Sequence, residues 1–108
     1  MHLKALACLG ALALLALAAG GPARSMPQTV DYTCSPAWDE GDTLEIDWNS
    51  GHKSITARFP NGSEMTMALE TGGSGFRYGE ADTEIFGKNQ QRITVHEGGE
   101  PNRVCTAQ

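Results

Sequence analysis

Apolar residues recur at every second position through most of this chain. Residues 44–48, for example, read Leu-Glu-Ile-Asp-Trp. This period of two is typical of strands with one buried side and one solvent-facing side, and no stretch beyond residue 20 has the 3.6-residue period of an amphipathic helix. The sequence therefore predicts an all-β domain. The alternation continues at Val30, Tyr32 and Cys34; Ile55, Ala57 and Phe59; Met65, Met67 and Leu69; Phe76 and Tyr78; Ile93 and Val95; and Val104.

Short polar turns separate the alternating segments. The strongest hairpin signal is Asn61-Gly62, because both residue types accept positive φ angles between two strands. Similar turn sequences occur at 49–51, 71–75 and 98–99. About eight short strands in roughly 80 residues predict a small antiparallel β-barrel over residues 30–108, or else a sandwich, because both arrangements limit exposed sheet edges. We expect the methionine pair and both tryptophans in the core.

The first 20 residues differ from the rest of the chain. A nearly unbroken Ala/Leu run over 5–19 follows Lys4 and ends in small residues, which is typical of a secretory signal peptide. The run is too short for a transmembrane helix, and Cys8 lies too early to be the lipid-modified residue of a lipoprotein. We predict a signal peptide over 1–20, a flexible lead-in over 21–29 and a soluble periplasmic protein with no stable membrane anchor. A retained anchor or a buried helix is the less favoured alternative.

Loss of the leader removes Cys8 and leaves two of the three cysteines. An even pair in an exported chain predicts a disulfide, here between Cys34 and Cys105, which closes a loop around nearly the whole domain. Two free thiols or a metal pair are the alternatives. Two cysteines without a nearby histidine pair do not form a structural zinc site, so we expect no metal.

Composition argues against several classes of function. The formal net charge is −5 at pH 7, whereas nucleic acids and anionic membranes require a basic patch; a basic partner is favoured instead. No phosphate-binding loop and no nucleophile elbow is present, so we expect neither enzymatic activity nor a cofactor. The cluster of His96, Glu97 and Glu100 suggests a metal ligand set, but adjacent strand residues face opposite sides, which favours a solvated turn.

Two segments rich in small residues each present one polar or cationic side chain. They read Ser74-Gly75-Phe76-Arg77-Tyr78 and Phe86-Gly87-Lys88-Asn89, and by themselves they are compatible with plain β-turns. Together with the leader, Tyr32-Thr33-Cys34 near the start of the domain and Cys105 near its end, they make residues 30–105 resemble the MliC/PliC family of bacterial inhibitors of c-type lysozyme. The resemblance implies an eight-stranded antiparallel barrel without catalytic activity.

The resemblance also implies how the site residues act. The Ser74 and Lys88 loops would enter the active-site cleft of a c-type lysozyme, with the Lys88 ammonium on a catalytic carboxylate and the Ser74 hydroxyl hydrogen-bonding beside it. Gly75 would allow close backbone approach, and Arg77 would contact the rim. Tyr78 would brace the loop from within. Asn89 replaces the glycine usual in the family, and asparagine suits a left-handed turn position.

Two further expectations concern the partner. C-type lysozymes are basic, so the acidic residues of this chain would steer encounter. The alternative function is an exported barrel that binds a glycan or small ligand in its mouth, with Trp38 or Trp48 as a stacking platform. The acidic residues that would steer encounter with a lysozyme are Asp39, Glu40, Asp42, Glu80, Asp82 and Glu84.

Overall fold

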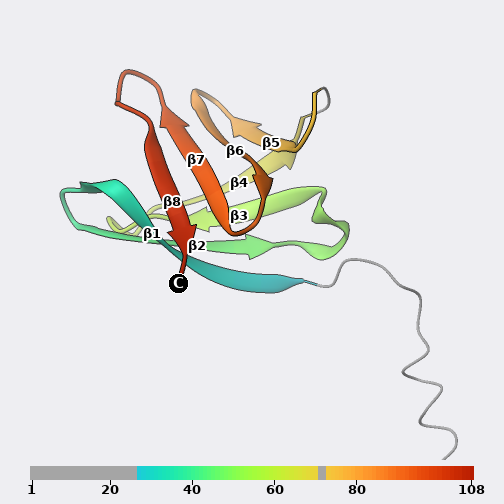
Figure 1. Ribbon diagram of the computed structural model, residues 1–108, viewed down its shortest axis with the longest axis horizontal. Helices are drawn as coiled ribbons and strands as arrows, with labels where there is room; N and C mark the ends of the chain where they lie inside the picture. The colour runs from blue at the N-terminus through green and yellow to red at the C-terminus, as the bar shows by residue number, and fades with distance from the viewer. Residues whose placement is uncertain (1–26, 71–72) are drawn as a thin grey trace, which may run out of the picture.

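The computed structural model describes residues 27–70 and 73–108, which form eight strands and one short 3-10 turn (Figure 1). The predicted leader and residues 21–26 of the predicted lead-in lie outside these residues. No helix in the described part of the chain is long and apolar enough to cross a membrane. The elements are β1 (Gln28–Trp38), β2 (Gly41–Trp48), η1 (Ser50–His52), β3 (Ser54–Arg58), β4 (Glu64–Leu69), β5 (Phe76–Glu80), β6 (Thr83–Asn89), β7 (Arg92–Glu97) and β8 (Arg103–Ala107).

Each strand pairs antiparallel with the next, and β8 pairs with β1, so the sheet closes into a barrel. In Figure 1, β2 and β3 run across the view while β7 and β8 cross them steeply, as the strand tilt of a small barrel requires. The prediction of an eight-stranded antiparallel barrel is confirmed. The hairpin predicted at Asn61-Gly62 is also present: Gly62 has φ +90° and its N–H donates to the Phe59 carbonyl (2.9 Å).

The apolar residues that recur at every second position fill the barrel interior as predicted, with two exceptions. Leu69 is 42% exposed because it ends β4, and Val104 is 37% exposed because its neighbours Arg103 and Cys105 face inward. Met65 and Trp38 are only partly buried, but both pack against the core. The buried apolar residues are Tyr32, Cys34, Leu44, Ile46, Trp48, Ile55, Ala57, Phe59, Met67, Tyr78, Ile85, Ile93, Val95 and Cys105.

Two element boundaries differ from the sequence prediction. The first strand begins at Gln28, inside the predicted lead-in, because Gln28 and Thr29 pair with β2 and the Thr29 hydroxyl donates to Asp47 (2.7 Å). Residues 85–89, read from sequence as a loop of small residues, belong to strand β6, with Ile85 fully buried. A Cβ at Gly87, inside this strand, would collide with the Arg92 carbonyl oxygen (2.9 Å) and make a tight contact with the Phe76 ring (3.3 Å).

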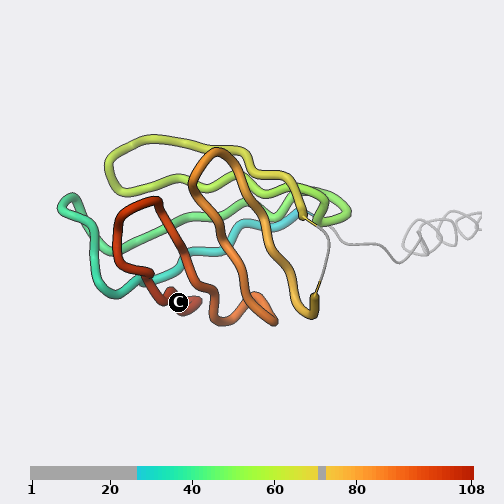
Figure 2. Tube along the Cα trace, turned by 90° about the horizontal axis from the view of Figure 1, so that it is seen from above, coloured from blue at the N-terminus to red at the C-terminus, as the bar shows by residue number. Residues whose placement is uncertain are grey.

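Consecutive antiparallel strands place alternate turns at opposite ends of the barrel (Figure 2). We call one end the site end, because Ser74 and Lys88 lie there, and the other the acidic end. Both termini of the described chain lie at the site end, since Gln28 pairs with Trp48 and the Ala107 N–H donates to the Gln91 carbonyl. The site end comprises turns 49–53 and 90–91 together with residues 70 and 73–75; the acidic end comprises turns 39–40, 59–63, 81–82 and 98–102.

Trp38 and Arg103 close the acidic end. The Arg103 guanidinium lies 4.5 Å from the Trp38 ring centroid, and the edge of Phe59 packs on the same indole. A single oxygen of Glu97 accepts hydrogen bonds from the Trp38 indole (2.9 Å) and from Arg103 (3.0 Å). Because the arginine side chain is 7% exposed, this ion pair and the ring contact compensate for the loss of its hydration.

The predicted disulfide joins Cys34 and Cys105, which lie directly opposite each other on β1 and β8. The bond therefore crosses the seam at which the barrel closes. Its two cysteines are 71 residues apart in sequence and nearly fully buried.

We expect the double variant Cys34→Ala/Cys105→Ala to lose about 4 kcal/mol of unfolding free energy, because the open chain regains the entropy that the long loop removes. Urea unfolding followed by circular dichroism measures this loss. The matched control is the unaltered protein assayed with reductant. If the double variant were as stable as the oxidised protein, the Cys34–Cys105 bond would not stabilise the closed barrel, which would contradict the prediction.

A cluster of ion pairs on the barrel's outer surface joins β2, β3 and β4. Arg58 donates to Asp47 (2.7 Å), Glu64 (2.8 Å) and Glu45 (3.1 Å). Hydrogen bonds from Arg58 and then from Thr29 lower the pKa of Asp47 below its usual value. Folding therefore favours the ionised form of the Asp47 carboxyl.

A carboxyl whose pKa falls on folding stabilises the protein above its unfolded pKa, and that contribution is lost as the pH drops through the folded value. We therefore expect Asp47→Asn to lower the melting temperature most above about pH 5, with the difference vanishing towards about pH 2. Thermal unfolding across this pH range measures the effect. Asp39→Asn is the control, since Asp39 forms no ion pair with the described residues. A constant Asp47→Asn difference at every pH would contradict the prediction.

Candidate functional site

The site is built on a close contact between two glycines. Gly75 has φ +79°, and a Cβ placed on it would collide with the carbonyl oxygen of Gly87 and lie 3.2 Å from the Lys88 Cα. Only glycine allows both this backbone angle and this approach. The contact holds the chain before β5 against the end of β6, so Ser74 and Lys88 are brought together although they are 14 positions apart in the numbering.

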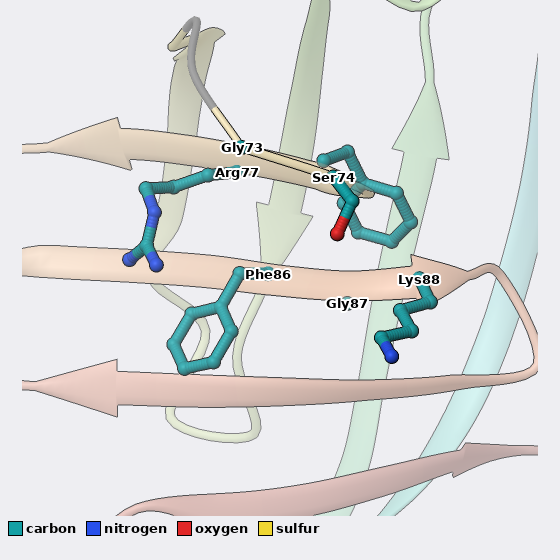
Figure 3. A pocket seen from close by; sticks show the side chains of 7 residues that line it. Gly73, Ser74, Arg77, Phe86, Gly87 and Lys88 are labelled. Atoms are coloured by element: carbon teal, nitrogen blue, oxygen red, sulfur yellow. The ribbon is translucent and has the colours of Figure 1, made fainter.

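Ser74 and Lys88 lie on the same surface of this paired backbone, and both are exposed (Figure 3). Among the described residues, the Lys88 ammonium forms no ion pair within 4.0 Å. A shallow concavity of about 220 Å³ lies between the two side chains. An ammonium and a hydroxyl at its edge make it suitable for a carboxylate. The concavity is lined by Gly73, Ser74, Phe76, Arg77, Phe86, Gly87 and Lys88.

Arg77 lies beside this concavity and is fixed by two contacts. Its guanidinium is 4.6 Å from the centroid of the Phe86 ring and pairs with Glu84 at 2.7 Å. Figure 3 shows Arg77 and Phe86 together on neighbouring strands, apart from Ser74 and Lys88. The ion pair with Glu84 offsets the charge of Arg77, so Lys88 is the stronger attractor for an incoming anion.

Tyr78 is 2% exposed, so it cannot form part of a contact surface. Its hydroxyl donates to the His52 carbonyl (2.6 Å), and its ring packs against Trp48 and Phe76. Burial raises the pKa of the Tyr78 hydroxyl. Tyr78 therefore braces the η1 turn, where His52 adopts φ +54°, from beneath the site.

The expectation for Asn89 is wrong. Asn89 does not adopt a positive φ angle; the non-glycine residues of the described chain that do are His52 and Ala81. Instead, the Asn89 side-chain oxygen accepts a hydrogen bond from the Gln91 N–H (2.9 Å). This hydrogen bond, and not a residue with a positive φ angle, tightens the turn between β6 and β7.

A second, larger concavity of about 470 Å³ opens at the site end next to Lys88. Sequence reasoning missed it, because Leu69 fits the inward pattern of β4 and was expected to be buried. In the structure Leu69 forms part of the rim, and Phe76 forms the aromatic side, backed by the buried rings of Trp48 and Tyr78. The remaining lining residues are Gly51, His52, Gly75, Lys88, Asn89 and Gln90.

Charge is distributed unevenly along the barrel. The site end carries the exposed cations Lys53, Lys88 and Arg92, together with Glu70. Five of the six acidic residues expected to steer a partner lie at or beside the acidic end, and Glu84 is paired with Arg77. Strands of six or seven residues separate the ends by about 20 Å, more than twice the screening length of about 8 Å at physiological salt. The five residues are Asp39, Glu40, Asp42, Glu80 and Asp82.

Neither tryptophan offers an open face. Trp48 is 1% exposed, and the Trp38 ring is covered by Arg103 and Phe59. His96 is hydrogen-bonded to Asn102 (2.7 Å), while Glu97 and Glu100 pair with Arg103. Within residues 27–70 and 73–108, no group of three or more His, Cys, Asp or Glu is arranged to hold a metal ion.

Comparison with protein-family models, with curated proteins and with solved structures gives no match to this chain. Function is therefore inferred from the site itself. Of the residues singled out from sequence, the fold brings Ser74, Gly75 and Lys88 into one surface, places Arg77 at its edge and buries Tyr78 beneath it.

The glycine contact predicts different effects at two neighbouring positions. Gly73→Ala introduces only backbone strain, since nothing lies within 4 Å of the new Cβ, and we expect a loss of about 1 kcal/mol in unfolding free energy. Gly75→Ala adds the collision with Gly87, and we expect about 2 to 4 kcal/mol. In amide NMR spectra, Gly75→Ala displaces the Gly87 and Lys88 signals and Gly73→Ala does not. Equal effects of the two substitutions would contradict the close contact.

Proposed function

We propose that this protein is an inhibitor of c-type lysozyme that blocks the active-site cleft with its site end. The observation that carries the proposal is the exposed Lys88 ammonium, which forms no ion pair with the described residues and lines the same concavity as Ser74, next to the Gly75–Gly87 contact. The proposal also draws on the sequence resemblance to the MliC/PliC inhibitors. The protein acts by occupying the cleft and catalyses nothing itself.

The chemistry of the target explains why this arrangement suits it. A c-type lysozyme carries two carboxyl groups that flank the scissile glycosidic bond. An intruding surface that removes water from these groups must provide an opposite charge or hydrogen-bond donors, because an unpaired buried carboxylate is costly. Lys88 supplies the charge, and Ser74 supplies a donor beside it.

Rigidity of the site favours tight binding. Association costs conformational entropy for every loop that becomes ordered, and a preorganised loop reduces that cost. Gly75 and Gly87 lock the two segments together, and Tyr78 supports the neighbouring η1 turn. The cations face the acidic cleft, while the net negative charge of the whole protein favours approach to a basic enzyme.

The direct test is lysis of bacterial cell walls by a c-type lysozyme in the presence of the oxidised protein. We expect near-stoichiometric inhibition by the unaltered protein. Lys88→Ala and Ser74→Ala should weaken it, Lys88→Ala by about 100-fold or more, since truncating one partner of a desolvated charge pair is costly. Lys53→Ala is the matched control, because Lys53 is an exposed cation at the same end of the barrel.

Circular dichroism establishes that each variant is folded. Retention of inhibition by folded Lys88→Ala would overturn the proposed mechanism. Absence of inhibition by the unaltered protein against all c-type lysozymes tested would overturn the proposed function.

A further inference from the structure

We propose that the larger concavity at the site end receives an apolar side chain of the inhibited enzyme, with Leu69 as its main contact. This inference rests on the proposed function and adds an apolar anchor to the polar contacts of Ser74 and Lys88. Leu69 belongs to neither sequence motif of the resemblance.

Leu69 stands out by its exposure. Leu69 and Val104 are the large hydrophobic residues that remain exposed in the described chain, at 42% and 37%. Val104 lies on the outer wall of β8, whereas Leu69 lies at the rim of a concavity of about 470 Å³. An exposed apolar side chain at the rim of a concavity is a typical feature of a binding surface.

The aromatic side of the concavity is rigid. Trp48 packs edge-on against Phe76 (5.2 Å between ring centroids) and against Tyr78 (5.7 Å). Tyr78 is anchored through the His52 carbonyl. Because the buried rings of Trp48 and Tyr78 fix the partly exposed Phe76 ring, an incoming side chain meets a preformed apolar surface and does not have to order it.

The concavity is continuous with the polar site. Lys88 and Phe76 line both this concavity and the smaller one beside Ser74. A partner group that reaches Lys88 therefore brings its neighbours over Leu69. Interfaces combine an apolar centre with a polar surround, and the Ser74 and Lys88 contacts alone supply no apolar centre.

The expected occupant follows from the chemistry of substrate clefts. Such clefts are lined mainly by hydrophobic and aromatic side chains, with a few polar groups placed among them. An enzyme that presents a catalytic carboxylate to Lys88 thus presents apolar side chains close to it. The concavity has room for a large side chain, and the Phe76 ring on its wall favours an aromatic one.

The test compares two substitutions of matched chemistry. Leu69→Ser and Val104→Ser each remove one exposed hydrophobic side chain, the first from the proposed contact and the second from the outer wall. We expect Leu69→Ser to weaken inhibition of lysozyme by about tenfold, as loss of a buried leucine contact implies. Val104→Ser should leave inhibition unchanged, and Leu69→Met should retain most of it.

Salt dependence separates this contact from the ionic one. Raising the salt concentration from about 50 to about 500 mM should weaken inhibition by the unaltered protein, because salt screens the charges that steer association, and should leave the fold-change caused by Leu69→Ser unchanged. If the unaltered protein inhibits and Leu69→Ser inhibits equally well, the apolar contact is overturned while the proposed function stands. If the unaltered protein does not inhibit, both are overturned.

Discussion

Closure of the sheet is the constraint on which the rest of the structure depends. In a chain of this length, eight short strands can bury their inward side chains only if the first strand also pairs with the last, as β1 does with β8. The Cys34–Cys105 bond lies at that seam. Closure also fixes the turns in two groups at opposite ends, so the position of the site follows from the topology.

Much of the fold was predictable because period-two alternation reports directly on which side of a strand is buried. The disulfide followed from the number of cysteines once Cys8 was assigned to the leader. Strand β6 was missed because Phe86-Gly87-Lys88 resembles a turn, whereas Gly87 lies within the strand where a Cβ would collide with the Arg92 carbonyl oxygen. The sequence signal for this strand was weak, because Ile85 is followed directly by another apolar residue, Phe86.

The candidate site was only partly predictable. The resemblance to the MliC/PliC inhibitors pointed to Ser74 and Lys88, but the contact that joins them extends the β5–β6 hairpin beyond the Phe76–Gly87 pair and depends on its register. Leu69 fits the inward pattern of β4 and becomes exposed only because the strand ends at the barrel mouth. Tyr78 is buried, and its hydroxyl braces the η1 turn instead of the Ser74 segment that the resemblance implied.

The location of the termini has a practical consequence for handling the protein. Both ends of the described chain lie at the site end, where β1 begins and where Ala107 is bonded to the turn between β6 and β7. An affinity tag or surface linker attached after Gln108 would therefore extend from the same end of the barrel as Lys88. The Asn61-Gly62 turn lies at the opposite end, so immobilisation through that exposed turn presents the site to solution.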